Sequence, residues 1–133
     1  MPKIIELESY SDARGSLVAV ESAKNIPFEI KRIYYIFANK PNLERGQHAH
    51  KNLKQIYIAV SGSCKVAFDD GKNKSEFVLN DPRKGLVIDE IIWREIKEIS
   101  ADCVMLVIAS DFYNEDDYIR NHDDFVKYIS KKS

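Results

Sequence analysis

Arg45-Gly46-Gln47-His48-Ala49-His50-Lys51 is the stretch around which this sequence is organised, and it holds two of the three histidines of the chain. Side chains two positions apart project from the same face of a β-strand, so His48 and His50 are expected to point at one target. Arg45 and Lys51 flank them with fixed positive charge. Paired imidazoles between cations are typical of a site for an anionic small molecule. The spacing leaves open whether the histidines bind a metal or transfer a proton.

Short strand-like segments lie on both sides of this stretch. They are rich in β-branched and aromatic residues and are separated by Gly, Pro, Asn or Asp about every ten residues. The predicted strands cover residues 3–7, 16–21, 30–37, 55–60, 64–68, 74–79, 86–88, 91–96 and 103–109. Only residues 116–128 change to a helical period, which predicts a turn and a short C-terminal helix. This all-β pattern predicts a sandwich or barrel, typically a jelly roll whose cavity is lined by the histidine strand.

The composition indicates one globular domain over residues 1–133, with 44% hydrophobic and 31% charged residues. The formal net charge of −1, without a basic stripe, argues against nucleic acid as a partner. The sequence shows neither a window near the ~20 apolar residues of a membrane span nor a signal peptide, so a cytoplasmic protein is expected. Cys64 and Cys103 lack metal-site spacing and are expected to be buried, reduced thiols.

Proton transfer is favoured over metal binding for the histidine pair. A metal site needs three or four ligands, and the later strands carry no further histidine. Gln55 stands where a carboxylate would be needed, and an amide is a poor ligand for a transition metal. The sequence therefore predicts a site without metal or other cofactor. An imidazole can act as base or acid near neutral pH, and a neighbour such as Arg45 or Lys51 would lower its pKa.

Other candidate residues have both a structural and a functional interpretation. Tyr35 lies on an apolar strand face and is either a core residue or an acid of the cavity. Trp93 is either a core residue or a wall for a sugar or base. His122, in the polar tail, is expected to be incidental. Four arginines could bind a diphosphate through their planar forks, although each could also be a solvated surface charge: Arg14, Arg32, Arg45 and Arg94.

Several motifs resemble the cupin proteins. Gly46-x-His48-x-His50, with Gln55 at the position of the usual glutamate and Gly62 closing the segment, resembles the first cupin motif. Pro82-x-x-Gly85 resembles the start of the second motif, whose histidine is missing here. That loss agrees with a metal-free site.

A larger set of motifs, from about residue 12 to residue 128, resembles the dTDP-4-keto-6-deoxyglucose 3,4-ketoisomerases, which are sugar-nucleotide isomerases of the RmlC-like cupin group. The motifs are Arg14-Gly15-Ser16-Leu17, Lys31-Arg32-x-Tyr34-Tyr35-Ile36-Phe37, Arg45-Gly46-x-His48-Ala49-His50-Lys51, Gly62-Ser63, Asp69-Asp70-Gly71, Trp93-x-Glu95 and Asp117-Tyr118-Ile119-Arg120. The resemblance implies an RmlC-like cupin jelly roll that forms a homodimer with exchange of N-terminal strands. It implies a dTDP-linked 4-keto-6-deoxy sugar as the substrate, whose keto group moves from C4 to C3. The product would then be aminated to a 3-amino-3,6-dideoxyhexose for a surface polysaccharide or glycan.

The resemblance also assigns residues. It implies that His48 and His50 are the catalytic pair and that Tyr35 lies near the sugar. One histidine would remove the C3 proton to give an enediol(ate), and the other, with Tyr35, would handle the oxygens. The predicted substrate-binding residues are Arg14, Arg32, Arg45, Lys51, Gln55 and Arg94. Of these, Arg14 and Arg94 are candidates for deciding between a galacto and a gluco product at C4.

Three other functions compete with this interpretation. A metal-dependent cupin oxygenase would need bound metal for activity. A dTDP-sugar 3,5-epimerase would use a His–Asp pair on separate strands, and no such aspartate is apparent near His48 in the sequence. A non-catalytic sugar-binding cupin that acts as a sensor would need a segment that transmits its signal, and the sequence shows no DNA-binding appendage.

Overall fold

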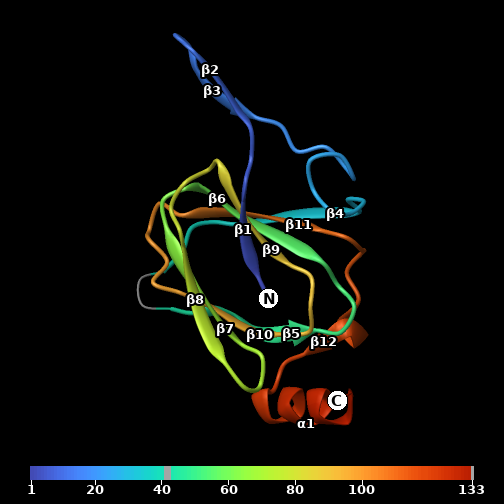
Figure 1. The fold of residues 1–133 in the computed structure, drawn as a ribbon. Coiled ribbons are helices and arrows are strands. Elements are labelled where there is room, and N and C mark those ends of the chain that lie inside the picture. The colour runs from blue at the N-terminus through green and yellow to red at the C-terminus, as the bar shows by residue number, and fades with distance from the viewer. Residues whose placement is uncertain (41–42, 133) are drawn as a thin grey trace.

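The computed structural model describes residues 1–40 and 43–132, which form two facing antiparallel sheets and one C-terminal helix (Figure 1). One sheet has the strand order β1-β9-β6-β11-β4, and the other has the order β12-β5-β10-β7-β8. The elements are β1 (Lys3–Glu6), β2 (Ser9–Asp12), β3 (Gly15–Val18), β4 (Arg32–Ile36), β5 (Arg45–His50), β6 (Gln55–Ser61), β7 (Cys64–Asp69), β8 (Lys74–Leu79), β9 (Lys84–Ile88), β10 (Trp93–Lys97), β11 (Val104–Ala109), the 3₁₀ turn η1 (Glu115–Asp117), β12 (Tyr118–Ile119) and α1 (His122–Lys132).

The register of β11 shows which side chains face the space between the sheets. Val107 is paired with Tyr34 on β4 and with Tyr57 on β6, and all three belong to the cluster of apolar side chains between the two sheets. Leu106 is paired with Tyr35 and lies on the opposite, outer face of the same sheet. Because side chains alternate along a strand, this register fixes the inward residues of β4, β6 and β11.

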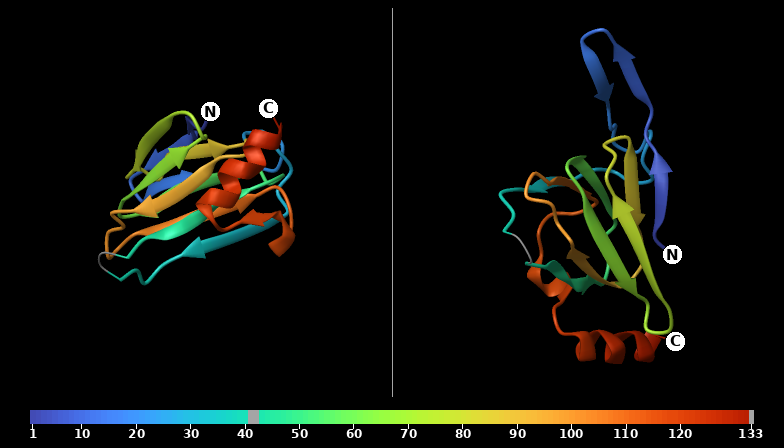
Figure 2. Two further views of the ribbon diagram at one scale, coloured as in Figure 1. Left: turned by 90° about the horizontal axis from the view of Figure 1, so that it is seen from below. Right: turned by 90° about the vertical axis from the view of Figure 1, so that its left-hand side faces the viewer.

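Both sheets are also covered on their outer faces. Ile26 and Phe28, in the connection between β3 and β4, pack with Leu7 against the outer face of the first sheet. On the second sheet, Phe125 of α1 packs against Trp93 and Ala49, and Figure 2 shows the helix lying across these strands. Ala49 is thus the small residue of β5 beneath the helix, while its two histidine neighbours point the other way.

The hairpin of β2 and β3 projects away from the two sheets (Figures 1 and 2). The sequence predicted a strand at residues 16–21. In the structure the strand is shorter, and Ser9–Asp12 pairs with it across a turn in which Gly15 adopts φ +137°. A backbone with this φ favours glycine.

The all-β fold and the C-terminal helix predicted from the sequence are confirmed, with differences at two short strands. β2 and β12 were not predicted, and the helix begins at His122, after η1 and β12, rather than within residues 116–121. Cys64 and Cys103 are buried and free, as predicted. Among the described residues, the structure contains no helix with the length and apolar character required to cross a membrane.

Candidate active site

His48 and His50 both point from β5 into the space between the sheets. Their rings lie edge to face with centroids 4.7 Å apart. His48 is 9% exposed and His50 is 1% exposed. The Nε2 atoms of both rings are buried and have no hydrogen-bond partner in residues 1–40 and 43–132. Because buried polar atoms are rarely left unpaired, these two nitrogens are suited to contact a ligand.

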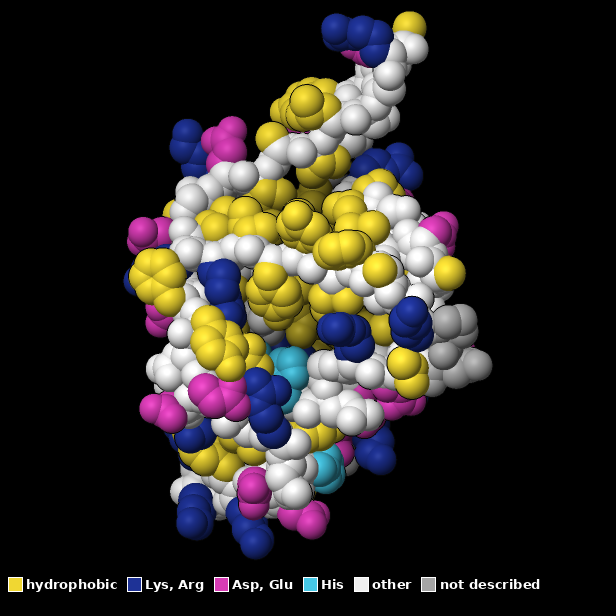
Figure 3. Space-filling view, turned by 180° about the vertical axis from the view of Figure 1, so that it is seen from behind, with side chains coloured by type: hydrophobic (Ala, Val, Ile, Leu, Met, Phe, Trp, Pro, Cys, Tyr) yellow, Lys and Arg dark blue, Asp and Glu magenta, His cyan; other side chains and the backbone are white. Residues whose placement is uncertain are grey.

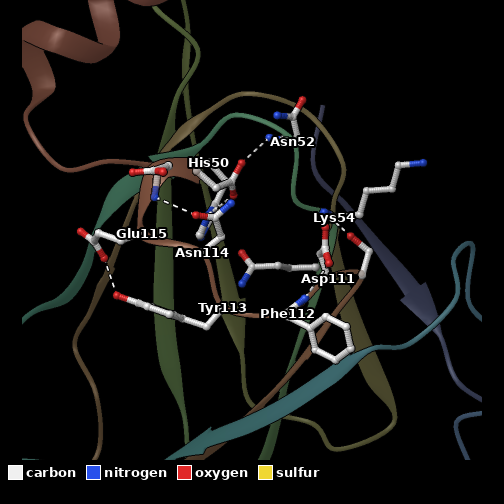
Figure 4. A network of polar contacts seen from close by, with 12 residues as sticks. His50, Asn52, Lys54, Asp111, Phe112, Tyr113, Asn114 and Glu115 are labelled. Atoms are coloured by element: carbon white, nitrogen blue, oxygen red, sulfur yellow. Dashed lines mark hydrogen bonds and ion pairs between the residues drawn. The ribbon is translucent and has the colours of Figure 1, made fainter.

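Asp117 is the partner of His50. Its Oδ2 lies 2.9 Å from His50 Nδ1, and its Oδ1 accepts a hydrogen bond of 2.8 Å from the backbone N–H of Asn52. Pairing of β12 with β5, which sets Tyr118 opposite His50, brings this carboxylate to the ring; Figure 4 shows His50 between the turn that carries Asn52 and the segment 111–115. An ionised carboxylate only accepts hydrogen bonds, so His50 donates from Nδ1 and keeps a lone pair on Nε2.

Arg94 is a fully buried cation beside the histidines, with 0% exposure. It is paired with His48 across β10 and β5. Its Nη1 donates to Gln55 Oε1 at 2.6 Å, and its Nη2 donates to the Ile92 carbonyl at 3.2 Å. Among the described residues no carboxylate pairs with this guanidinium, and its Nε has no partner. A buried charge without a counter-ion is costly, so this position favours an anionic ligand or transition state.

Burial keeps both histidines neutral at physiological pH. Burial, and then the charge of Arg94, lower the pKa of His48 to about 2 and that of His50 to about 3. Arg120 and, for His50, Arg32 act in the same direction. The sequence attributed this effect to cations next to the histidines in the chain, whereas the cations that lower the pKa come from other strands and from the C-terminal segment. A neutral imidazole can accept a proton, and His50, which donates from Nδ1, has its free lone pair on Nε2.

The tyrosine of the cavity is Tyr34, and the prediction that Tyr35 is the catalytic tyrosine is corrected. Tyr34 faces inward, and its hydroxyl accepts a hydrogen bond of 3.1 Å from Gln55 Nε2. Tyr35 is 62% exposed on the outer face, with its ring 5.8 Å from that of Phe37. Alternation along β4 places the two tyrosines on opposite faces of the sheet, so only one of them can face the histidines.

Arginine and tyrosine side chains surround the histidine pair. The Arg32 guanidinium lies 5.3 Å from the Tyr34 ring and 5.7 Å from the Tyr113 ring. Arg120 lies 4.1 Å from the Tyr118 ring and donates two hydrogen bonds, of 2.6 and 2.8 Å, to Glu115. The Tyr118 ring in turn contacts both imidazoles. Figure 3 shows a histidine side chain within a hollow bordered by hydrophobic, Lys and Arg side chains.

The structure brings together only part of the predicted set. His48, His50, Gln55, Arg94 and Arg32 lie at this site, although Gln55 is bonded at both ends of its amide to protein groups. Three predicted substrate-binding residues lie elsewhere in this chain. Arg14 is on the projecting hairpin, paired with Asp12; Arg45 is exposed at the other end of β5; and the Lys51 ammonium lies over the Tyr128 ring of α1.

Besides Tyr34, three residues of the site were missed as candidates from the sequence: Asp117, Tyr118 and Arg120. All three belong to the Asp117-Tyr118-Ile119-Arg120 motif on which the resemblance partly depends, and that motif was the available signal. The sequence argument concerned an aspartate on a strand near His48, whereas the structure has a His–Asp pair at His50, with Asp117 on the 3₁₀ turn η1. The presence of a His–Asp pair therefore does not separate an epimerase from a ketoisomerase here.

The donors around the two imidazoles do not suit a metal ion. Within the described residues no group of three or more His, Cys, Asp or Glu side chains is placed to hold one. The next charged neighbour of His48 is Arg94, a cation that would repel a metal, and Gln55 Oε1 already accepts from Arg94. The donor set instead suits an anion that exchanges protons.

A two-sheet β fold of this topology, with base-form histidines and an uncompensated arginine inside it, belongs to the cupin-like enzymes that rearrange anionic substrates by proton transfer. Within that class, the chain belongs to the family described as FdtA: WxcM-like, C-terminal, whose model matches residues 1–130. The family predicted from the sequence is therefore confirmed.

Known relatives of the chain are isomerases of sugar nucleotides. The chain is 51% identical to the TDP-4-oxo-6-deoxy-alpha-D-glucose-3,4-oxoisomerase of Aneurinibacillus thermoaerophilus over 97% of this chain and 93% of that protein. It is 52% identical to the WlaRB TDP-quinovose 3,4-ketoisomerase of Campylobacter jejuni, with a TM-score of 0.90 over 95% of this chain and 97% of that one. These relatives support the predicted isomerase class.

The resemblance to an epimerase concerns the fold alone. The dTDP-4-dehydrorhamnose 3,5-epimerase of Bacillus anthracis has a TM-score of 0.76 to this chain, covering 88% of this chain and 76% of that one, at 14% identity. This match agrees with the RmlC-like jelly roll predicted from the sequence.

Proposed function

We propose that this protein is a 3,4-ketoisomerase that moves the keto group of dTDP-4-keto-6-deoxyglucose from C4 to C3. The observation that carries the proposal is the pair of neutral, buried imidazoles whose Nε2 atoms lack partners among the described residues, next to the uncompensated Arg94 guanidinium. The relatives named for this reaction support the choice of substrate.

The reaction requires a base, an acid and a group that stabilises negative charge. The C3 proton lies next to the C4 ketone, so one of His48 and His50 removes it, and the electron pair forms the C3–C4 double bond of an enediolate. The O3 hydroxyl then gives up its proton as the C3 ketone forms. C4 takes up a proton from the protonated base, and O4 takes up the proton released by O3 and becomes a hydroxyl. The other histidine serves the sugar oxygens. Arg94 stabilises the enediolate charge, because an opposite charge in a water-poor site acts strongly and needs no reorganisation.

Arg32 and Arg120 are the proposed contacts of the diphosphate. Both lie close enough to the histidines to lower the pKa of His50, and the buried Nε of Arg32 has no partner among the described residues. Planar guanidinium groups match phosphate oxygens. Tyr113, which contacts Arg32 and whose hydroxyl donates to Glu115, lies beside them.

A second copy of the chain is proposed to complete the site. The outer face of β4 carries three exposed apolar side chains, Ile33, Tyr35 and Phe37, and the projecting hairpin exposes Leu17. A homodimer that exchanges the N-terminal hairpin would cover such surfaces, and it would carry Arg14 away from its own His pair to that of the partner. Arg14 would then act on the sugar in trans, where it could influence the C4 configuration together with Arg94.

Complementation between two variants tests this arrangement. Arg14→Ala and His48→Asn are each expected to impair activity. When equal amounts of the two variants are unfolded together and reassembled, half of the dimers contain one chain of each variant. If Arg14 acts in trans, one of the two sites in such a dimer has both His48 and Arg14. Activity should therefore return to roughly a quarter of wild type. An Arg14 that acts within its own chain gives no recovery, and a monomer in sedimentation analysis would contradict the dimer itself.

We further propose that the enzyme works as one domain in the cytoplasm, without cofactor, and that its product is aminated at C3 to a 3-amino-3,6-dideoxyhexose for a surface glycan. A 3-keto sugar is the form that an aminotransferase accepts at that carbon. Conversion of the product to a 3-amino sugar nucleotide by an added aminotransferase is the expected outcome. Failure of the product to be aminated at C3 would contradict this role.

Proton exchange followed by NMR in deuterated buffer tests the reaction itself. Incubation with dTDP-4-keto-6-deoxyglucose should give a 3-keto species, with loss of the original C3 proton, and the C4 configuration of the product can be read from the same spectra. Exchange at C5 would indicate a 3,5-epimerase instead. The absence of any exchange would indicate a sugar-binding protein, and activity that disappears on chelation and returns with metal would contradict the metal-free mechanism.

A further inference from the structure

Gln55 is a buried amide whose two ends are both bonded inside the protein. It is 0% exposed. Its Oε1 accepts from Arg94 Nη1 at 2.6 Å, and its Nε2 donates to the Tyr34 hydroxyl at 3.1 Å. Three strands thus contribute one chain of hydrogen bonds: Arg94 from β10, Gln55 from β6 and Tyr34 from β4. Gln55 was predicted to bind substrate, but each polar end of its amide already has a protein partner.

We infer that Gln55 is a positioning residue that directs the Tyr34 O–H into the cavity, where it donates to the sugar oxygen that becomes the enediolate. This inference rests on the proposed ketoisomerase reaction and adds to it the group that holds the oxygen.

The direction of each hydrogen bond follows from the chemistry of Arg94. A guanidinium has donors and no acceptor, so the end of Gln55 that faces it must be the carbonyl oxygen. The amide nitrogen therefore faces Tyr34, and an amide N–H₂ can only donate. The tyrosine oxygen is consequently the acceptor in this bond, and its own hydrogen must point elsewhere. Arg94 itself donates to the Ile92 carbonyl. The donor and acceptor of each hydrogen bond from Arg94 to Tyr34 are therefore fixed, beginning at a backbone carbonyl.

The Tyr34 hydrogen has no acceptor within the part of the chain that the structure describes, because the bond from Gln55 is the one recorded for its hydroxyl. The ring faces inward, on the side of the sheet that faces the histidines. Burial raises the pKa of Tyr34 above its usual value, so the hydroxyl keeps its proton at neutral pH. Tyr34 is therefore a neutral donor inside the cavity, and a sugar oxygen that gains negative charge is the acceptor that it fits.

The same chain of bonds explains why a glutamine stands at the position where cupins usually carry a glutamate. A carboxylate there would accept from Arg94 and also from the Tyr34 O–H, because it has acceptors only. The tyrosine hydrogen would then point at residue 55 and away from the cavity. The carboxylate would also neutralise Arg94. A glutamine avoids both effects with nearly the same shape.

A double-mutant cycle between Tyr34→Phe and Gln55→Glu tests the inference in the full-length protein. Each single variant is expected to lower kcat about 10–100-fold, within the range for loss of one donor to a developing charge, with KM changed less than about threefold. Because the two changes remove the same donor, the double variant should retain at least about tenfold more activity than the product of the two single losses predicts. Multiplication of the two losses would overturn the inference.

Tyr128→Phe is the control. It removes a tyrosine hydroxyl from α1, which packs on the outer face of the second sheet, and is expected to leave kcat within about twofold of wild type. Thermal unfolding of each variant shows whether it folds, and Gln55→Met, which keeps the size but not the hydrogen bonds, serves if Gln55→Glu does not fold. Gln55→Met should lower kcat less in the Tyr34→Phe background than in wild type, and equal losses in the two backgrounds would overturn the inference. An inactive wild-type protein would contradict the proposed function, whereas an active wild type with independent losses would contradict only the role of Gln55.

Discussion

The two ends of the space between the sheets differ in what they bury. Where β11 begins, Met105 is paired with Ala59 and Ile36, and the side chains around it are apolar. Where β11 ends, Ala109 is paired with Gln55 and Arg32, and the surroundings are polar and charged. The same strands pass through both ends, so one layer of backbone supports two environments.

The difference shows which end stabilises the fold and which performs the reaction. The apolar end gains free energy by removing hydrocarbon surface from water. The polar end holds a cation without a counter-ion among the described residues and two imidazoles whose charged form is disfavoured by burial, and each of these features costs stability. Such costs persist where function requires them. Changes at the polar end are therefore expected to alter activity, and changes at the apolar end to alter stability.

The largest expected effect is on activity, from His48→Asn and His50→Asn. Each variant keeps a polar side chain of similar size but has no base, so kcat should fall about 10²–10⁴-fold. Because neither imidazole is charged in the folded protein, the fold and the binding of the nucleotide should remain. Turnover, thermal unfolding and titration with TDP measure the three properties. Full activity in both variants would show that the imidazoles are not the proton-transfer groups.

The next largest effect is on stability, from Leu79→Ala at the apolar end. Leu79 is buried at the end of β8, opposite Cys64 on β7. Loss of a buried leucine side chain costs about 2–5 kcal/mol of unfolding free energy, while kcat at low temperature should stay within about twofold of wild type. Val78→Ala, one residue earlier and exposed, is the control, with an expected change below about 0.5 kcal/mol. A large loss of kcat in folded Leu79→Ala would show that the two ends are not independent.

The sequence predicted most of the fold because the signals for strands and turns lie within short stretches of the chain. β-Branched and aromatic runs between turn residues located nine of the strands, and a two-residue spacing placed both histidines on one face. That same spacing puts Lys51, at an odd position, on the other face, so its assignment to the site could have been corrected from the pattern alone. Alternation does not hold at Arg45, because a register shift between β5 and β10 sets Arg45 opposite Ile96.

Other features depend on contacts that the sequence does not show. Asp117 lies 67 positions from its partner His50, and a strand of two residues brings it there. The pattern of β4 favoured the wrong face for its tyrosines. The outward Ile33, Tyr35 and Phe37 are all apolar or aromatic, whereas the inward face carries the charged Arg32 beside Tyr34. A period of two shows which residues share a face, but it does not show which face is inside when the inner face holds a polar site.

The smallest expected effect is a dependence of stability on pH that arises at the polar end. Burial and Arg94 lower the pKa of His48 to about 2 and of His50 to about 3, whereas an unfolded chain has a histidine pKa near 6.5. Between pH 6.5 and pH 3 the unfolded chain therefore binds more protons than the folded protein, so unfolding becomes easier as the pH falls. Arg94, Arg32 and Arg120 oppose protonation of the rings, and Asp117 is the acidic group that faces His50.

Each imidazole contributes a slope of at most about 1.4 kcal/mol per pH unit in this window. Urea unfolding at pH 7, 6 and 5 measures the slope. The double variant His48→Asn/His50→Asn has no titrating ring at either position. Its unfolding free energy should therefore fall less between pH 7 and pH 5 than that of wild type. An unchanged slope would mean that the rings are protonated as readily in the folded protein as in the unfolded chain, and that the polar end does not keep its bases neutral by excluding water.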